Sequence, residues 1–97
     1  MRDEDDIIIC FNRAFSEIKN IQKKHENYYS VISHNGRLLI SFYMTDGKNS
    51  IKEIKYLDKI TKNQAIDLAR FLSENAIEQS VWKDIVDDYS NKLVSAI

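Results

Sequence analysis

The chain has 97 residues, of which 43% are hydrophobic and 30% charged, and its formal net charge is −1. This composition excludes an intrinsically disordered chain, and the length predicts a single domain over residues 1–97. One cysteine excludes an internal disulfide scaffold, and no apolar run approaches membrane-spanning length. Because the start MRDEDD is acidic whereas secretory signals begin with basic residues, we expect a cytoplasmic protein.

The first patterned segment predicts a helix from about residue 6 to about residue 24. Its apolar residues recur at steps of four and three, which places one stripe on a helix: Ile7, Phe11, Ala14, Ile18 and Ile21. Acidic residues precede the segment, and Lys23 and Lys24 stand at its end, which suits the helix dipole. We interpret Cys10, beside the stripe, as a small buried apolar residue.

Two strands follow, YYSVISH and RLLISFYM, joined by Asn35-Gly36. This dipeptide is typical of a two-residue type I′ hairpin, which pairs Val31 with Ile40. One face of the hairpin then gathers Tyr29, Val31, Leu38, Ile40, Phe42 and Met44. The other face carries Tyr28, Ile32, Leu39 and Tyr43.

The turn Asp46-Gly47-Lys48 leads into a third strand, whose register depends on the length of the loop. An odd loop places Ile54 and Tyr56 beside the Leu38, Ile40 and Phe42 set. A loop of four residues places Glu53 and Lys55 there instead. Because burying unpaired charges is costly, we expect the odd loop.

The segment ITKNQAIDLARFL predicts a second helix, with a capping box between Thr61 and Gln64 and a stop at Asn75. A third helix gathers Trp82, Ile85, Val86, Tyr89, Leu93 and Ile97 on one side. The two helices are either separate or one bent helix, since neither glycine nor proline stands between them.

Together these elements predict one compact α+β domain in the order helix, three-stranded antiparallel meander, helix, helix (αβββαα). The expected core is Ile7, Phe11, Phe15, Ile18, Val31, Ile40, Phe42, Ile54, Leu68, Leu72, Trp82, Ile85 and Leu93. The second face of the meander is too apolar to be left wholly in water. Either helices cover both faces, or one face meets a partner.

The residue types that catalysis requires do not converge in this sequence. Neither His25 nor His34 has a second histidine or a cysteine at metal-ligand spacing, so we expect no metal site. The glycine-rich phosphate-binding motifs and the G-x-S-x-G nucleophile motif are not present. We therefore predict a protein that is not an enzyme and that uses no cofactor.

The middle of the chain is basic, since residues 19–62 contain nine basic and four acidic groups. The residues that would bind nucleic acid there are Arg37, Lys52, Lys55, Lys59 and Lys62. The expected element order over about residues 6–76 also resembles the double-stranded RNA-binding domain, whose second helix begins with lysines. In KITKNQAIDLARFL, Lys59 and Lys62 match those lysines, and the resemblance implies that they contact phosphates.

Two other surfaces are candidates for binding a protein. Asp84, Asp87 and Asp88 share one side of the third helix, where they would steer a partner and set its register. Tyr28, Tyr43 and Leu39 on the second face of the meander would be apolar anchors, because tyrosine combines apolar area with a hydrogen-bonding group. The same face also suits a homodimer.

These observations lead to a hypothesis about function. We expect a small non-catalytic protein that binds another protein, such as a toxin or a nucleic-acid-handling enzyme, and inhibits it by occlusion. Bacterial immunity-type proteins and phage anti-defence proteins, including anti-CRISPR proteins with a similar order of elements, are fold-level analogies for this role. The alternatives are a nucleic-acid-binding regulator and a structural homodimer.

Overall fold

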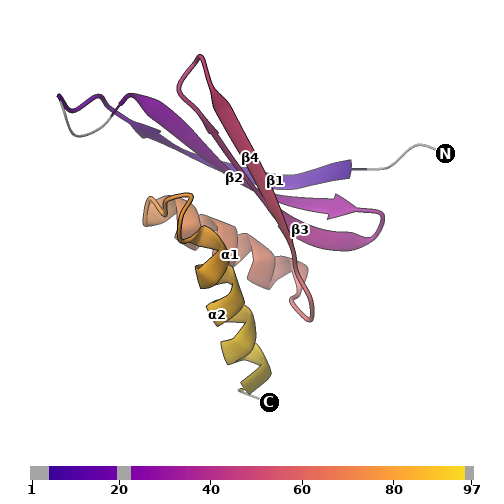
Figure 1. The fold of residues 1–97 in the computed structure, drawn as a ribbon. Helices are drawn as coiled ribbons and strands as arrows, with labels where there is room; N and C mark the ends of the chain where they lie inside the picture. The colour runs from indigo at the N-terminus through magenta and orange to yellow at the C-terminus, as the bar shows by residue number, and fades with distance from the viewer. Residues whose placement is uncertain (1–4, 20–22, 96–97) are drawn as a thin grey trace.

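The computed structural model describes residues 5–19 and 23–95, and it describes the side chains of all of these except residues 5 and 93–95. The elements are β1 (Asp5–Phe15), β2 (His25–His34), β3 (Arg37–Thr45), β4 (Ser50–Tyr56), α1 (Lys62–Glu74) and α2 (Trp82–Ser95). The strands form one antiparallel sheet in the order β1-β2-β3-β4. Figure 1 shows both helices on the same side of this sheet. None of the described helices is long and apolar enough to cross a membrane.

The prediction of an α+β domain with an antiparallel meander is confirmed, but the strand count and the first element are wrong. Residues 5–15 form strand β1 rather than the start of a helix, so the order is ββββαα and differs from the order that suggested an RNA-binding domain. Ile9 and Phe11 pair with Val31 and Tyr29 of β2, on the side of the sheet that the helices cover. Residues 16–19 and 23–24 of the expected helix are not helical either, and residues 20–22, including Ile21, lie outside the described residues.

The competing strand pattern explains this error. The run IIICF is continuous enough to satisfy an alternation of two as well as a helical stripe, and isoleucine is enriched in strands. Pairing with β2 decides between the two conformations. A bulge between Ile7 and Ile9 then shifts the register of β1, which leaves Ile7 68% exposed.

The β2–β3 hairpin has the predicted register. Asn35 and Gly36 have φ angles of 50° and 83°, the positive values that a type I′ turn requires. Val31 therefore pairs with Ile40 and Tyr29 with Phe42, and all four side chains are fully buried.

The predicted odd loop between β3 and β4 is wrong. Thr45 pairs with Ser50, so the loop has residues 46–49, and Phe42 faces Glu53 while Ile40 faces Lys55. The turn itself fixes this length, because one carboxylate oxygen of Asp46 accepts hydrogen bonds from the backbone N–H of Lys48 at 2.8 Å and of Asn49 at 2.7 Å. These bonds also lower the pKa of the Asp46 carboxyl group.

Side chains of α2, and Gln79 just before it, interact with the charged residues that this register directs toward the helices. Glu53 accepts hydrogen bonds from the indole N–H of Trp82 at 2.9 Å and from the side-chain amide of Gln79 at 3.2 Å. Lys55 lies 2.9 Å from a carboxylate oxygen of Asp87. The penalty that favoured the odd loop applies to charges without partners, whereas Glu53 is hydrogen-bonded and Lys55 forms an ion pair.

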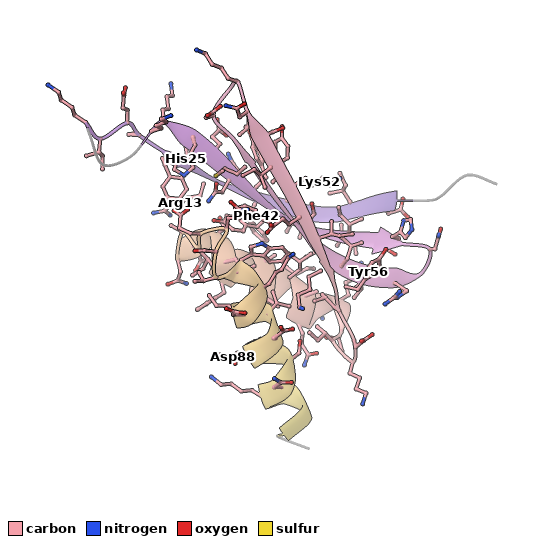
Figure 2. The ribbon with its side chains drawn as sticks, viewed as in Figure 1. Arg13, His25, Phe42, Lys52, Tyr56 and Asp88 are labelled. Carbon is pink, nitrogen blue, oxygen red and sulfur yellow. The ribbon has the colours of Figure 1, made fainter. Side chains whose placement is uncertain are left out.

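The core lies between the sheet and the helices. Figure 2 shows Phe42 there, and its ring stacks on that of Trp82 with centroids 5.9 Å apart. The predicted core residues that are buried are Val31, Ile40, Phe42, Leu68, Leu72 and Trp82. Ile7, Ile18 and Ile54 are exposed instead, which corrects the prediction, while Phe11, Phe15 and Ile85 are partly buried. The side chain of Leu93 lies outside the described residues.

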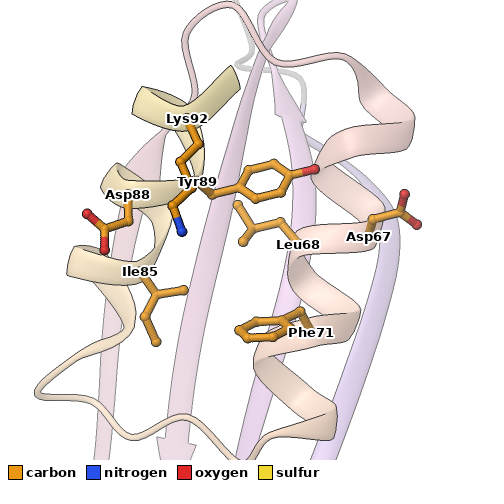
Figure 3. Close-up of a pocket in the computed structure, with 7 residues that line it drawn as sticks. All are labelled: Asp67, Leu68, Phe71, Ile85, Asp88, Tyr89 and Lys92. Carbon is orange, nitrogen blue, oxygen red and sulfur yellow. The ribbon is translucent and has the colours of Figure 1, made fainter. Parts of the chain in front are cut away.

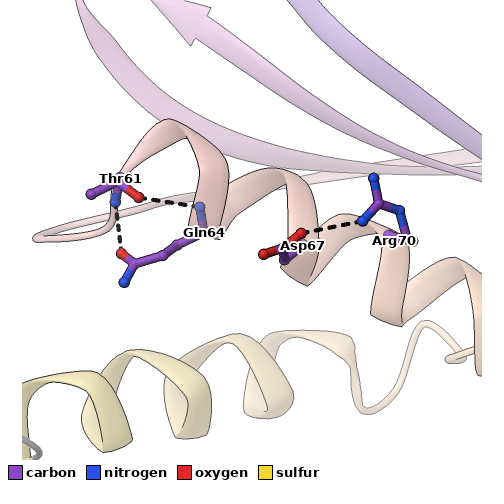
Figure 4. Close-up of polar contacts among 4 residues, drawn as sticks. All are labelled: Thr61, Gln64, Asp67 and Arg70. Atoms are coloured by element: carbon purple, nitrogen blue, oxygen red, sulfur yellow. Dashed lines mark hydrogen bonds and ion pairs between the residues drawn. The ribbon is translucent and has the colours of Figure 1, made fainter.

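The ends of α1 follow the predicted signals. Figure 4 shows the capping box, in which the backbone N–H of Gln64 donates to the Thr61 hydroxyl at 3.2 Å and the backbone N–H of Thr61 donates to the Gln64 side chain at 2.9 Å. At the other end, Ala76 N–H donates to Ser73 and Ile77 N–H to Leu72, which is a Schellman motif. This motif separates α1 from α2.

Ala76 generates the first prediction, because it holds the left-handed φ of 50° that glycine adopts without steric cost. We expect Ala76→Gly to raise the free energy of unfolding by about 0.5–1 kcal/mol. Urea denaturation followed by circular dichroism measures the change. The control Ala69→Gly, inside α1, should lower the same quantity by about 1 kcal/mol or more. A destabilised Ala76→Gly variant would contradict the assignment of the motif.

The second prediction concerns Glu53, whose pKa is lowered first by the hydrogen bond from Trp82 and then by that from Gln79. A lowered native pKa stabilises the fold above the ordinary glutamate value of about 4.3, and this contribution is lost as the pH falls through the native pKa. We expect Glu53→Gln to lower the free energy of unfolding by about 1 kcal/mol at pH 7 and by less at pH 3. Urea denaturation at both pH values measures this, with exposed Glu74→Gln as the control. A pH-independent difference would refute it.

Candidate functional site

The face of the sheet opposite the helices is the candidate site, and we call it the open face. Among the described residues, no helix covers it. The strand registers arrange its central side chains in three rows across β2, β3 and β4: Tyr28, Tyr43 and Lys52; Ser30, Ser41 and Ile54; Ile32, Leu39 and Tyr56. Two rows of large side chains therefore flank one row with two serines.

The first row contains a tyrosine pair. The rings of Tyr28 and Tyr43 have centroids 5.8 Å apart and planes inclined at 49°. The Tyr28 hydroxyl donates to a carboxylate oxygen of Glu26 at 2.8 Å, which fixes the ring. The same hydrogen bond is the main cause that raises the pKa of the Tyr28 hydroxyl above its ordinary value.

The opposite end of the open face combines a cation with an aromatic ring. The guanidinium carbon of Arg37 lies 4.2 Å from the centre of the Tyr56 ring, within the range of a cation–π interaction. The ring of His34 meets the edge of Tyr56 with centroids 6.5 Å apart. Arg37 itself is exposed beside the tyrosine.

The open face exposes more apolar surface than the sequence prediction named. Ile54 is 43% exposed and Tyr56 37%, and the four-residue loop places both on this face. Leu39 lies on the face as expected but is only 4% exposed. Leu39 therefore supports the surface, while the tyrosines and Ile54 are available for contact.

The structure does not bring the five basic candidates together. Arg37 and Lys52 lie on the open face, whereas Lys55 lies on the covered face against Asp87. Lys59 belongs to the connection between β4 and α1, and Lys62 is the first residue of α1. Only two of the five cations therefore share a surface with the tyrosines.

The three acidic candidates all lie on α2, on the helical side of the molecule. Asp87 is bound to Lys55, and Asp84 stands in the first turn, where a negative charge stabilises a helix. Figure 2 shows Asp88 on the part of α2 that extends away from the sheet. A flat partner on the open face cannot reach these carboxylates.

Sequence reasoning missed a groove of about 480 Å³ between α1 and α2. Figure 3 shows the residues that line it: Asp67, Leu68, Phe71, Ile85, Asp88, Tyr89 and Lys92. The signal in the sequence was the position of Phe71 at the edge of the apolar stripe of α1, where it remains 49% exposed. How far the two helices diverge is a tertiary property that no local pattern encodes.

The described residues contain no cluster of three or more histidine, cysteine or acidic side chains that could hold a metal ion. Cys10 is exposed on β1, which corrects its interpretation as a buried residue. Comparisons with protein-family models, curated proteins and solved structures found no match to this chain.

The bond between Tyr28 and Glu26 yields a prediction for the open face. We expect Glu26→Gln to lower the pKa of Tyr28 toward its ordinary value, because the charged acceptor that holds the phenolic proton is lost. Carbon-13 NMR titration of the tyrosine Cζ signals measures the pKa. Exposed Glu17→Gln is the control and should leave the Tyr28 titration unchanged. An unchanged pKa in Glu26→Gln would contradict the arrangement.

Proposed function

We propose that this chain is a non-catalytic binding protein that docks on another protein through its open face. The single observation that supports this most strongly is the placement of both helices on one side of the sheet, which leaves the tyrosine rows on the other side in contact with solvent. Exposed apolar side chains gathered on one face are characteristic of interaction surfaces.

The chemistry of the open face suits a protein partner. Tyr43 and Tyr56 offer large rigid side chains with few rotatable bonds, and Tyr28 is already held by Glu26, so little conformational entropy is lost on binding. Four strands of 11, 10, 9 and 7 residues, about 4.8 Å apart, give a flat area of roughly 600 Å². This is somewhat below the roughly 800 Å² that one partner contributes to a standard interface.

Arg37 and Lys52 define the charge of the proposed partner. They lie toward opposite ends of the face, outside its central row. Carboxylates on the partner would accept their hydrogen bonds and accelerate the encounter. Occlusion by such a face is the mode of inhibition that we propose. An immunity-type or anti-defence inhibitor is the form of this proposal that we favour, by analogy with the small size of such inhibitors and not with their order of elements.

A photo-crosslinking experiment tests the protein-binding proposal. A photoreactive amino acid replaces Ile54 on the open face, and the control replaces Glu74 on α1. After irradiation in lysate from the source cells, we expect one defined adduct with a different protein from position 54 and none from position 74, with adducts between two copies of this chain scored separately. Tyr43→Asp should remove the adduct while circular dichroism shows an unchanged fold. Equal adducts from both positions, or none from position 54, would refute the proposal.

A second candidate function is the binding of single-stranded nucleic acid on the same face. The supporting observation is the contact of Arg37 with Tyr56, together with Lys52 beside Tyr43, because paired cations and aromatic rings hold phosphates and stack bases. Fluorescence anisotropy with labelled single-stranded RNA and DNA tests it. Two phosphate contacts predict a slope of about −1.4 in log K against log salt, reduced in Arg37→Ala and unchanged in Asp84→Ala. The absence of salt-dependent binding would exclude this candidate.

A further inference from the structure

We infer that the groove between α1 and α2 is a homodimer interface, in which the same two helices of a second copy of this chain occupy it. The interface lies on the helical side of the molecule, so it is distinct from the open face. The inference does not depend on the proposed function. It rests on three features of the groove: its apolar lining, the overhang of α2 and the charges on its rim.

The groove presents a projecting side chain and a hollow on one surface. Phe71 is 49% exposed on α1, and facing it on α2 are Ile85 and Tyr89, which are partly buried. Figure 3 shows Phe71 and Ile85 on opposite walls, with Leu68, which is 2% exposed, between the helices. A surface that carries both parts is self-complementary about a two-fold axis, as the interface of a symmetric dimer must be.

The packing of α2 leaves this groove incomplete in one copy. Trp82 and Val86 in its first half are 0% and 1% exposed, whereas the helix then extends away from the sheet, as Figure 1 shows. Beyond Val86, α2 therefore faces α1 across the groove without the sheet beneath it. A second pair of helices would complete the layer in the manner of a four-helix bundle.

The charges on the rim identify a second copy as the occupant. Asp67 is paired with Arg70 at 3.2 Å, which leaves Asp88 and Lys92 as rim charges of opposite sign. If two α2 helices pack antiparallel about an axis level with residue 90, Asp88 of each copy lies opposite Lys92 of the other. A helix of single-sign charge would be repelled by one of the two residues. Two copies related by symmetry satisfy both.

The size of the interface predicts a weak dimer. Helices of 13 and 14 residues are about 20 Å long, and two of them side by side present a flat area of roughly 400 Å² per copy. Over both copies this is about 800 Å², below the roughly 1,200 Å² at which stable specific interfaces begin, which implies a weak dimer that dissociates at low concentration. In such a dimer the two open faces point away from each other, so it would bind two targets at once.

Sedimentation velocity over a range of protein concentrations tests the inference. We expect the mass to rise with concentration from the monomer value of 11.4 kDa toward twice that value. Phe71→Glu should weaken dimerisation at least about tenfold, because it places a charge in the apolar contact. Tyr43→Asp on the open face is the control and should dimerise as the unmodified chain does.

A charge exchange gives an independent test that does not depend on Phe71. Asp88→Lys and Lys92→Asp should each weaken dimerisation about fivefold, because each brings like charges together. The double variant should return to within about twofold of the unmodified chain, since the pair is restored. A monomer at every concentration overturns the inference. So does a dimer that Phe71→Glu leaves unchanged, or one that Tyr43→Asp dissociates.

Discussion

The position of α2 depends on two charged side chains on the covered side of β4. Glu53 accepts the indole N–H of Trp82, and Lys55 binds Asp87, so the edge strand holds the first two turns of the helix. The same contacts place the Trp82 ring on Phe42 in the core. Because side chains alternate along a strand, this register also directs Ile54 and Tyr56 to the opposite side. One set of polar contacts therefore determines both how the core closes and what the open face displays.

Local chemistry made part of this fold predictable from the sequence. Asn35-Gly36 and the Thr61–Gln64 box act within four residues, and the structure has both as expected. Residues 5–15 were mispredicted because an apolar run this continuous fits both the helical and the strand periodicity. Pairing with β2 decides between them, and the residues of β2 lie outside the run itself. The predicted register of β4 was wrong for a similar reason, since the partners of Glu53 and Lys55 come from α2 and from Gln79 just before it, far along the chain.

The open face and the α1–α2 groove differ in how far they can be predicted from the sequence. The pairing of Tyr28 with Tyr43 follows directly from a correctly placed hairpin turn, so this part of the open face was predictable. The α1–α2 groove follows from the angle at which two helices leave the Schellman motif, and no residue pattern specifies that angle. The molecule thus has an aromatic sheet surface on one side and an apolar helical cleft on the other. Each can be occupied without obstructing the other.

The irregularity of β1 between Ile7 and Ile9 bears on how the molecule behaves at high concentration. An outermost strand of 11 residues with an exposed isoleucine would otherwise offer a template for another chain. The extra residue breaks the even spacing of backbone donors and acceptors along that edge, so a neighbouring chain cannot extend the ladder without interruption. Fibril-like growth requires such uninterrupted stacking. The bulge therefore favours discrete complexes over open-ended polymers.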